Sequence, residues 1–537
     1  MSLKGYYEAS LRPPVADDAA AVAEWDWGEA VLDSAAYMVD KKNHTSARCR
    51  FRRKVLDERE VEMRVTLCLA PPPLVSYFCC HAHYTDDDDD QEKDARLFVS
   101  EPTMFAMEGD LALIALCHGT DRPSLMDMNK SYYEYLVYQA GKGELTRLPH
   151  PAPDMLSKKG SHCFSASSIG LVPYSSSSTS QGDDAYRVAA LGKDYFHDDA
   201  YSPYFLCIYD SKTNAWTRKP GLVPQPPLPP SDFISDTAIT FGGGIVAWVD
   251  LWCGMLLADV LAAADLHLFR YVSLPKPRQP PNWLPLVIDL APCFRNIVLV
   301  KQTGIIRFVD LQVHAEPGHR SETPSGWMVV TWTLEGLRHS RDSENPLGGD
   351  ICFRLEHELH SRDIENYNLP KSLFVSNPIL SSHKDGVLYL RTNASSTTNT
   401  DSRVIAVDII NKKLLKVAEC DMQRPGAYRR TTISSYLKPP VSKENMKRRG
   451  PVSLESSYRK KPQQQPAVTN PAEGVEVDVG DPMDLDSSII RDWAQFIHEL
   501  CTTASDILGL LQGDTERFTS YGRMGYVTSK MLHGATL

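Results

Sequence analysis

Long apolar runs are missing from this 537-residue sequence. No stretch approaches the ~20 uncharged apolar residues that a membrane-spanning helix needs. The first residues carry no apolar signal core, and Glu8, Asp17 and Asp18 among them argue against a transit peptide. Cysteine is sparse, at 12 residues, and without a secretory signal this predicts reduced thiols. We therefore expect a cytoplasmic or nuclear protein that does not enter a membrane.

The common catalytic signatures are also absent. The sequence has no GxSxG nucleophile elbow, no GxxxxGK[ST] phosphate loop and no GxGxxG dinucleotide-binding motif. The group of motifs that marks protein kinases is also missing. His357-Glu358-Leu359-His360 comes close to a zinc-protease helix, but its second histidine stands one position early. Two histidines share a helix face at i and i+4, so this spacing does not fit the metal, and we interpret the segment as surface charge.

Metal-ligand spacing is found in one short segment, Cys79-Cys80-His81 followed by His83. In a strand, Cys79, His81 and His83 would share one face, which makes a three-ligand site conceivable. No second pair of ligands stands nearby in the sequence to complete it. We therefore expect buried thiols followed by exposed histidines, with no metal, no cofactor and no catalytic residue.

Positive charge of the kind that binds nucleic acid is lacking. The net charge is −11, so no global basic field favours DNA, RNA or an anionic membrane. Two basic clusters, 447–449 and 459–461, resemble a two-part nuclear import signal, but no aromatic residues are interleaved with them. The sequence thus argues against a nucleic-acid partner.

A recurring phrase is the main positive feature of the chain. An apolar strand runs into a polar turn, and a second strand then ends near a proline, best seen in Phe205–Pro220. Leu136–Pro149, Ile245–Pro275 and Val387–Cys420 are looser copies. A four-stranded propeller blade takes about 40–50 residues, so residues 31–436 predict an all-β fold, a β-propeller of about six blades, with seven as the alternative.

Two other interpretations of this β region stay open. The same short strands could build a pair of β-sandwiches. Within the region, Gly254–Leu268 has enough leucine and alanine to form at least one helical turn.

The remaining composition divides the chain into five parts. Residues 1–30 form an N-terminal segment and 31–436 the propeller-like domain. Residues 437–485 are rich in Pro, Gln, Lys, Arg and Glu, and with so few large apolar residues they predict a disordered linker. An amphipathic helix is expected over 486–513, and 514–537 form a tail.

The expected C-terminal helix has an unusually wide apolar face. Its spacing alternates between three and four residues, which is typical of a helix that packs against a partner. It would either dock on its own domain, associate with a second copy, or bind a protein partner through these side chains: Ile490, Trp493, Ile497, Leu500, Leu508 and Leu511.

One segment resembles a known family. Val246–Pro277 is similar to the core motif of the plant family called domain of unknown function 1618. The resemblance rests on the WVDLW string, which contains Trp248, Asp250 and Trp252, and on residues after it that include Gly254, Asp259, Leu274 and Pro275. It implies an uncharacterised plant protein without established enzymatic activity, similar in layout to the β-propeller modules that accompany F-box proteins.

The motif residues are expected to be structural. We predict that Trp248 and Trp252 pack on one strand face and that Asp250 and Asp259 cap turns. The function hypothesis is a non-enzymatic scaffold that binds unknown protein partners through loops at one propeller face. The alternative is a hydrolase or metal-dependent enzyme with its site in the central channel.

Overall fold

The computed structural model describes these residues: 6–14, 28–52, 58–85, 97–98, 100–118, 132–151, 168–175, 184–193, 204–224, 226–230, 233–263, 265, 267–276, 291–315, 324–336, 351–365, 369–370, 373–393, 402–419 and 428–437. Contacts divide the chain into two compact units, Met1–Pro440 and Val441–Leu537, and all described residues belong to the first. None of the helical segments among them is long and apolar enough to cross a membrane. Apart from Leu437, the predicted linker, C-terminal helix and tail lie outside the described residues.

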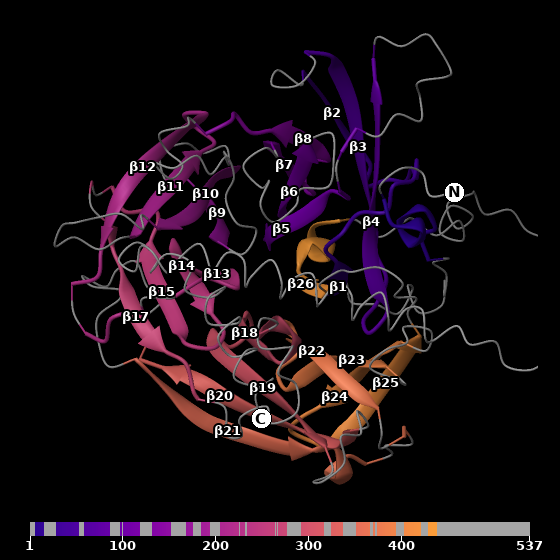
Figure 1. Cartoon of the computed structure of the whole chain (residues 1–537), viewed down its shortest axis with the longest axis vertical. Coiled ribbons are helices and arrows are strands. Elements are labelled where there is room, and N and C mark those ends of the chain that lie inside the picture. Colours follow the sequence, from indigo (N-terminus) through magenta and orange to yellow (C-terminus); the bar gives the residue numbers. More distant parts are fainter. Residues whose placement is uncertain are drawn as a thin grey trace, which may run out of the picture. The chain divides into compact units, whose positions relative to one another are not determined.

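The described part is all-β, which confirms the predicted class. Its helical segments are short 3-10 turns: η1 (Glu8–Leu11), η5 (Ala291–Cys293), η6 (Ser361–Asp363) and η7 (Ile433–Tyr436). The strands form six sheets, which we number in chain order (Figure 1). The separate sheets arise because most connections are hairpins, so each strand pairs chiefly with its sequence neighbours.

The first three sheets are built from the N-terminal half of the unit. The first has the order β2-β3-β4-β1-β26 and comprises β1 (Ala30–Asp33), β2 (Ala47–Arg52), β3 (Glu60–Cys68), β4 (Val75–Tyr84) and β26 (Tyr428–Thr431). The second comprises β5 (Thr103–Glu108), β6 (Leu111–His118), β7 (Tyr132–Gln139) and β8 (Glu144–Arg147). The third has the order β16-β12-β11-β10-β9 and comprises β9 (Ile169–Ser175), β10 (Asp184–Lys193), β11 (Tyr204–Asp210), β12 (Ala215–Leu222) and β16 (His267–Leu268).

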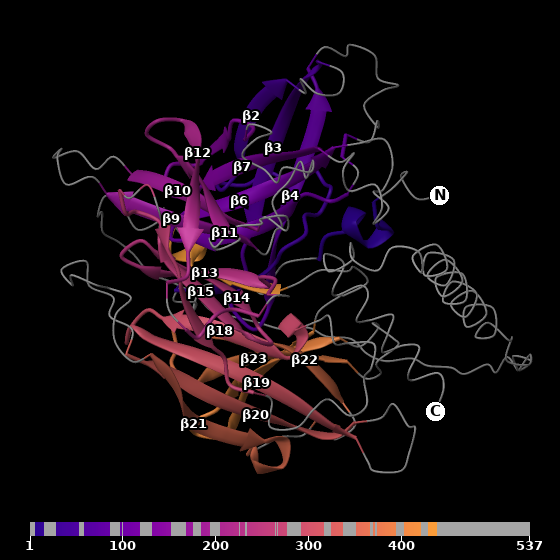
Figure 2. The same ribbon diagram turned by 60° about the vertical axis from the view of Figure 1, so that its left-hand side comes forward.

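The other three sheets follow in sequence. The fourth comprises β13 (Thr237–Gly242), β14 (Ile245–Asp250), β15 (Gly254–Asp259) and β17 (Arg270–Ser273). The fifth comprises β18 (Arg295–Val300), β19 (Ile305–Ala315), β20 (Pro324–Glu335) and β21 (Cys352–His360), and Figure 2 shows its long central strands β19 and β20 side by side. The sixth comprises β22 (Phe374–Leu380), β23 (Val387–Asn393), β24 (Arg403–Asp408) and β25 (Lys413–Glu419).

The hydrophobic core is divided into clusters that lie between successive sheets. Side chains of the first and second sheets share one cluster, and the second and third share another. Further clusters join the third sheet to the fourth, the fourth to the fifth and the fifth to the sixth. A sixth cluster joins the sixth sheet to the first, where Val31 of β1 packs with Tyr389 of β23. Each sheet is therefore buried on both faces.

Burial on both faces explains why the described residues of Gly254–Leu268 begin with a strand, β15, and not with a helix. Met255 and Leu257 enter the cluster shared with the fifth sheet, whereas Leu256 and Ala258 enter the cluster shared with the third. A strand that is covered on both faces is apolar at every position, so it lacks the alternation that marks a half-buried strand. The expectation of a helical turn here was wrong for this reason.

The recurring phrase corresponds to hairpins, although not always to the same pair of strands. Phe205–Pro220 spans β11 and β12, and Leu136–Pro149 spans β7 and β8, which are the third and fourth strands of their sheets. The looser copies begin one strand earlier, at β14 and β23. The phrases also touch: the Trp216 indole donates a hydrogen bond to the carbonyl of Pro149, at 2.7 Å.

Candidate functional site

The motif that carries the family resemblance lies in the fourth sheet, at the β14–β15 turn. Asp250 is fully buried at the end of β14, and its carboxylate accepts hydrogen bonds from the backbone N–H groups of Trp252 (3.0 Å) and Cys253 (3.2 Å). Asp259 ends β15 in the same way and accepts from the N–H of Leu261 (2.9 Å). Both carboxylates thus occupy the position that holds a turn in shape.

An arginine of the fifth sheet binds the first of these turns. Arg295 is fully buried, and its guanidinium donates to Asp310 Oδ1 at 2.8 Å and to the carbonyl oxygen of Leu251 at 2.9 Å. It also lies 4.9 Å from the ring centroid of Trp252, within the range of a cation–π contact. Burial lowers the pKa of Arg295, while the carboxylate of Asp310 acts in the opposite direction.

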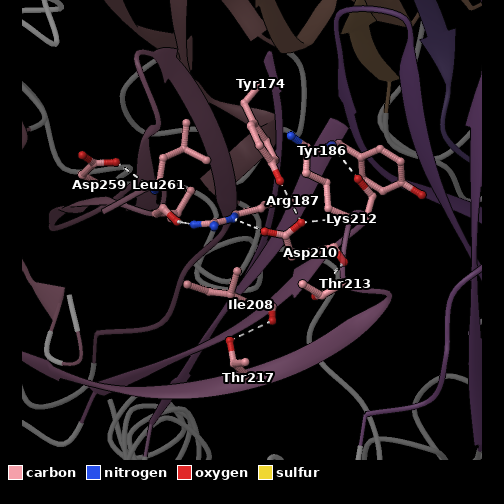
Figure 3. Close-up of polar contacts among 12 residues, drawn as sticks. Tyr174, Tyr186, Arg187, Ile208, Asp210, Lys212, Thr213, Thr217, Asp259 and Leu261 are labelled. Atoms are coloured by element: carbon pink, nitrogen blue, oxygen red, sulfur yellow. Dashed lines mark hydrogen bonds and ion pairs between the residues drawn. The ribbon is translucent and has the colours of Figure 1, made fainter. Parts of the chain in front are cut away.

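An equivalent arrangement binds the second turn from the third sheet (Figure 3). Arg187 donates to Asp210 Oδ2 at 2.8 Å and to the carbonyl oxygen of Val260 at 2.8 Å. Tyr174 also donates to Asp210, at 2.8 Å, and the pKa of this carboxyl is lowered, since hydrogen bonds from Tyr174, the backbone and Arg187 together outweigh its desolvation. The fourth sheet is therefore held on both sides by an arginine–aspartate pair of a neighbouring sheet.

The two tryptophans of the motif point to different neighbours. Trp248, in β14, packs in the cluster shared with the third sheet and donates from its indole to the carbonyl of Ser168 at 2.7 Å. Trp252 packs against the cluster shared with the fifth sheet. The prediction that they share one strand face was wrong, because the strand ends at Asp250 and Trp252 lies in the turn.

The other motif residues complete the packing of the fourth sheet. A Cβ at Gly254 would collide with the hydroxyl of Tyr271 and the carbonyl of Val272, so the neighbouring strand requires glycine here. Leu274 is buried and its N–H donates to the carbonyl of Cys253 at 3.1 Å, while Pro275 is half-buried. The motif residues thus serve packing and hydrogen bonding. No two of them form an acid–base pair.

The sequence candidates for a metal site do not gather. In the part of the chain that the structure describes, no group of three or more His, Cys, Asp or Glu could hold a metal ion. Cys79 is buried, while His81 and His83 are half-buried with their ring centroids 5.5 Å apart. His357 and His360 lie on β21, a strand, where His360 contacts Glu358 at 3.1 Å.

The expected partner-binding helix cannot be placed, since Ile490, Trp493, Ile497, Leu500, Leu508 and Leu511 all lie outside the described residues. The described part offers another apolar surface, on the outer strand of the sixth sheet. Leu415 and Val417 of β25 are 50% and 37% exposed, and Ile410, in the turn before β25, is 48% exposed.

This surface, which we call the β25 edge, consists of Ile410, Leu415 and Val417 with the exposed lysines Lys412, Lys413 and Lys416. In the sheet β25 pairs with β24, and on its other side Glu365 bridges Lys413 at the start of the strand. Beyond Leu414 no described strand covers this side.

Two of the other outer strands, β2 and β8, carry more polar surfaces. β2 presents three exposed arginines, Arg48, Arg50 and Arg52, and in β8 the exposed residues are Glu144 and Thr146. Charged side chains on an edge strand discourage pairing with another chain, whereas exposed apolar ones invite it. The β25 edge carries exposed lysines too, but its exposed Leu415 and Val417 make it a candidate interaction surface in the described part.

Sequence reasoning missed the β25 edge, although one signal was present. Leu414 and Leu415 are adjacent, which breaks the alternation of a half-buried strand. The structure explains the break by a bulge: Val407 pairs with Leu414 and Ala406 with Lys416, so Leu415 is the extra residue.

Comparison with known proteins gives one family. Residues 248–389 match the family described as "Protein of unknown function (DUF1618)". This match begins at the tryptophan of the motif and runs through the fifth sheet to β23 of the sixth.

The other comparisons are local or distant. A stretch of 29 residues is 66% identical to tetraketide alpha-pyrone reductase 1 of Arabidopsis thaliana, and it covers 5% of this chain and 9% of that protein. A fungal alcohol oxidase of the AA5 family, solved with copper, is 12% identical with a TM-score of 0.30 over 71% of this chain and 63% of its own. Hydrazine synthase of Kuenenia stuttgartiensis is 12% identical with a TM-score of 0.28 over 59% of this chain and 74% of its own. Likenesses of this size carry no argument about fold or activity.

Proposed function

Because this chain belongs to the DUF1618 family, described only as proteins of unknown function, we propose from its own residues that it is a non-enzymatic protein-interaction scaffold. Its first unit is a β-propeller of six blades, and it recognises an extended segment of a partner protein at the β25 edge. The exposed apolar side chains of β25 are the observation that carries this proposal.

Two sets of contacts support six blades. Each sheet shares a buried cluster with the next one in the chain, and the sixth shares a cluster with the first. The first strands β5, β9, β13, β18 and β22 contact one another in that order, and β22 contacts β26. Small sheets with two apolar faces need this kind of stacking, since no single sheet can bury both faces by itself. A pair of β-sandwiches would instead place sheets in facing pairs.

The β25 edge suits an added strand. A strand at a sheet edge offers backbone donors and acceptors to an extended peptide, and its side chains select the sequence. Leu415 and Val417 would contact apolar side chains of the peptide, while Lys412, Lys413 and Lys416 favour carboxylates. We therefore propose an extended partner segment in which acidic and apolar residues alternate.

The proposal is tested with the full chain and a labelled synthetic peptide in which Glu and Val alternate over ten positions. We expect binding measured by fluorescence anisotropy that weakens with added salt, as screening of the lysines requires. A peptide with Lys in place of Glu should not bind. The double variant Lys413→Glu, Lys416→Glu should exchange the two preferences.

The matched control is a second exposed leucine on another outer strand. Leu355 on β21 is 43% exposed. Leu415→Asp should abolish peptide binding, and Leu355→Asp should leave it unchanged. Equal effects of the two substitutions, or binding that ignores the charge of the peptide, would refute recognition at the β25 edge.

The alternative of a metal-dependent enzyme with a site in the central channel stays a prediction. Metal measured in the purified chain, and lost on Cys79→Ser and His81→Ala, would favour it over the scaffold.

A further inference from the structure

A second chemical feature lies in the first sheet, away from the motif and the β25 edge. Cys68 ends β3, and in the antiparallel register it stands opposite Tyr77 of β4, with Cys79 two residues further along the same strand. Opposed and i, i+2 positions share one face of a sheet. These three side chains form a buried cluster with Tyr37.

A lysine lies at the edge of this cluster. Lys41 donates a hydrogen bond from Nζ to the hydroxyl of Tyr77, at 2.9 Å, and Tyr77 in turn donates to the carbonyl of Pro14, at 3.0 Å. The tyrosine is thus fixed, and its hydroxyl holds the ammonium group at the edge of the cluster that contains the two thiols. The pKa of Lys41 is raised, since Tyr77 and the thiols outweigh the effect of its burial.

The two thiols of the cluster differ from each other. A hydrogen bond with Cys79 and the positive charge of Lys41 lower the pKa of Cys68 to about 7, against the effect of burial. The same hydrogen bond, together with burial, raises the pKa of Cys79. The groups that act on the Cys68 thiol are therefore Cys79, Lys41 and Tyr77.

The neighbouring Cys80 is a natural contrast. It points into the cluster between the first and second sheets, and burial raises its pKa well above the ordinary value. A buried cysteine in apolar surroundings is inert, whereas a thiol beside a cation reacts as the thiolate.

We propose that Cys68 is a peroxide-reactive thiol and that Cys79 is its resolving partner. The sulfur of Cys68 attacks one oxygen of a hydroperoxide, the O–O bond breaks, and the second oxygen leaves as hydroxide or alkoxide and takes up a proton. Cys68 is oxidised to the sulfenic acid and the peroxide is reduced. The Cys79 sulfur then attacks the Cys68 sulfur, and an S–S bond forms with release of one water molecule.

Oxidation of Cys68 also removes one of the effects that raise the pKa of Cys79, which favours the second step. In the reduced cluster the pKa of Cys79 is raised chiefly by its hydrogen bond to Cys68, and further by burial and by the negative charge of Cys68. A sulfenic acid is neutral, so the effect of that charge disappears once Cys68 is oxidised. This site is a modification site that would join β3 to β4 covalently, and it does not depend on the proposed scaffold function.

The experiment uses the full chain treated with hydrogen peroxide at pH 7, with sulfenic acid trapped by dimedone and disulfides identified by mass spectrometry. We expect a Cys68–Cys79 disulfide that dithiothreitol reverses. The variant Cys79→Ser should accumulate dimedone-labelled Cys68 instead. Exposed Cys352 and buried Cys80 are the internal reference thiols.

Lys41 provides a second and milder test. Lys41→Gln should shift the midpoint of Cys68 alkylation to higher pH and slow its oxidation at pH 7 roughly fivefold, since the thiolate fraction falls more than nucleophilicity rises. Lys41→Arg keeps the charge and should retain most of the rate. Oxidation of Cys68 no faster than that of Cys352 would overturn the proposal. Sulfenic acid that persists in the unaltered chain would overturn the role of Cys79.

Discussion

At the scale of single residues, two arginine–aspartate pairs fix the fourth sheet between its neighbours. In each pair the two residues stand opposite each other on adjacent antiparallel strands, Arg187 with Asp210 and Arg295 with Asp310. Each guanidinium has further N–H groups, and one of them donates a hydrogen bond to a backbone carbonyl of the fourth sheet. An arginine can do this because its fork of N–H groups serves a carboxylate and a carbonyl at once.

The buried pair should be sensitive to loss of either partner. Asp310→Ala leaves the guanidinium of Arg295 buried and uncompensated, which costs about 3–5 kcal/mol in the free energy of unfolding. The measurement is urea denaturation followed by tryptophan fluorescence. Replacing both residues by apolar ones, Arg295→Met with Asp310→Leu, should cost less than the single change.

The control for this experiment is an exposed pair of the same sheet. Arg354 contacts Glu335 at 2.5 Å, and both side chains are exposed. Surface pairs contribute about 0–1 kcal/mol, so Glu335→Ala should lie within that range. A cost for Asp310→Ala as small as that for Glu335→Ala would contradict the role assigned to the buried pair.

Residue roles were predictable from the sequence only where the partners are close along the chain. Asp250 and Asp259 bond N–H groups two residues ahead, so their type and spacing sufficed to expect capped turns. Arg295 and Arg187 bind carbonyls that are 44 and 73 residues away. No local pattern contains such a partner, because it depends on which sheets become neighbours.

At the scale of elements, the two-residue strand β16 links two sheets. It pairs with β12 of the third sheet, through Gly221 with His267, although it lies in sequence between β15 and β17 of the fourth. The His267 ring is buried, and Nδ1 donates to the carbonyl of Asp259 at 3.1 Å. The junction thus depends on a histidine that stays neutral.

This junction should weaken in mild acid. Burial lowers the pKa of His267 below its ordinary 6.5, with Lys219 and Arg187 adding repulsion, so the unfolded chain binds the proton more readily. The stabilisation is complete above pH 6.5 and is lost as the pH falls from there through the folded value. The urea midpoint, measured between pH 7.5 and 5.5, should fall for the unaltered chain and fall less for His267→Gln. Identical slopes would show that His267 takes no part.

Element types were predictable where apolar and polar residues alternate or where a turn is marked. The β11–β12 hairpin was found through the polar turn of Phe205–Pro220. The β15 strand was mistaken for a possible helix, because a strand buried on both faces has no polar face to reveal its period. The outward position of Leu415 escaped prediction, since a bulge depends on the pairing with β24.

At the scale of the whole first unit, both ends of the described chain enter the first sheet. β26 pairs antiparallel with β1, matching Ala30 with Thr431, and β1 pairs parallel with β4 (Figure 1). The sequence did not predict this arrangement, because neither short strand has a sequence feature that identifies the strand it pairs with. Because β26 follows the sixth sheet in the chain, its pairing with β1 joins the N-terminal and C-terminal parts of the first unit in one sheet.

Glu29, just before β1, adds a second tie to the sixth sheet. Its carboxylate is buried and accepts hydrogen bonds from the N–H of Ser382 at 2.9 Å and from the hydroxyl of Tyr389 at 3.0 Å. The hydroxyls of Ser381 and Ser382 and the N–H of His383 also donate to it. One carboxylate thus accepts hydrogen bonds from the first three residues of the turn between β22 and β23, Ser381, Ser382 and His383.

Removing this carboxylate should destabilise the first unit as a whole. Glu29→Ala leaves several buried donors without an acceptor, at about 1–3 kcal/mol for each group that water cannot reach. We expect a lower urea midpoint in one cooperative transition, because the first and sixth sheets share a core cluster. Glu8→Ala, which removes an exposed pair with Arg12, is the control and should shift the midpoint little. If Glu29→Ala instead split the transition in two, the first and sixth sheets would fold independently, and the ring of six blades proposed above would have lost its closing contact.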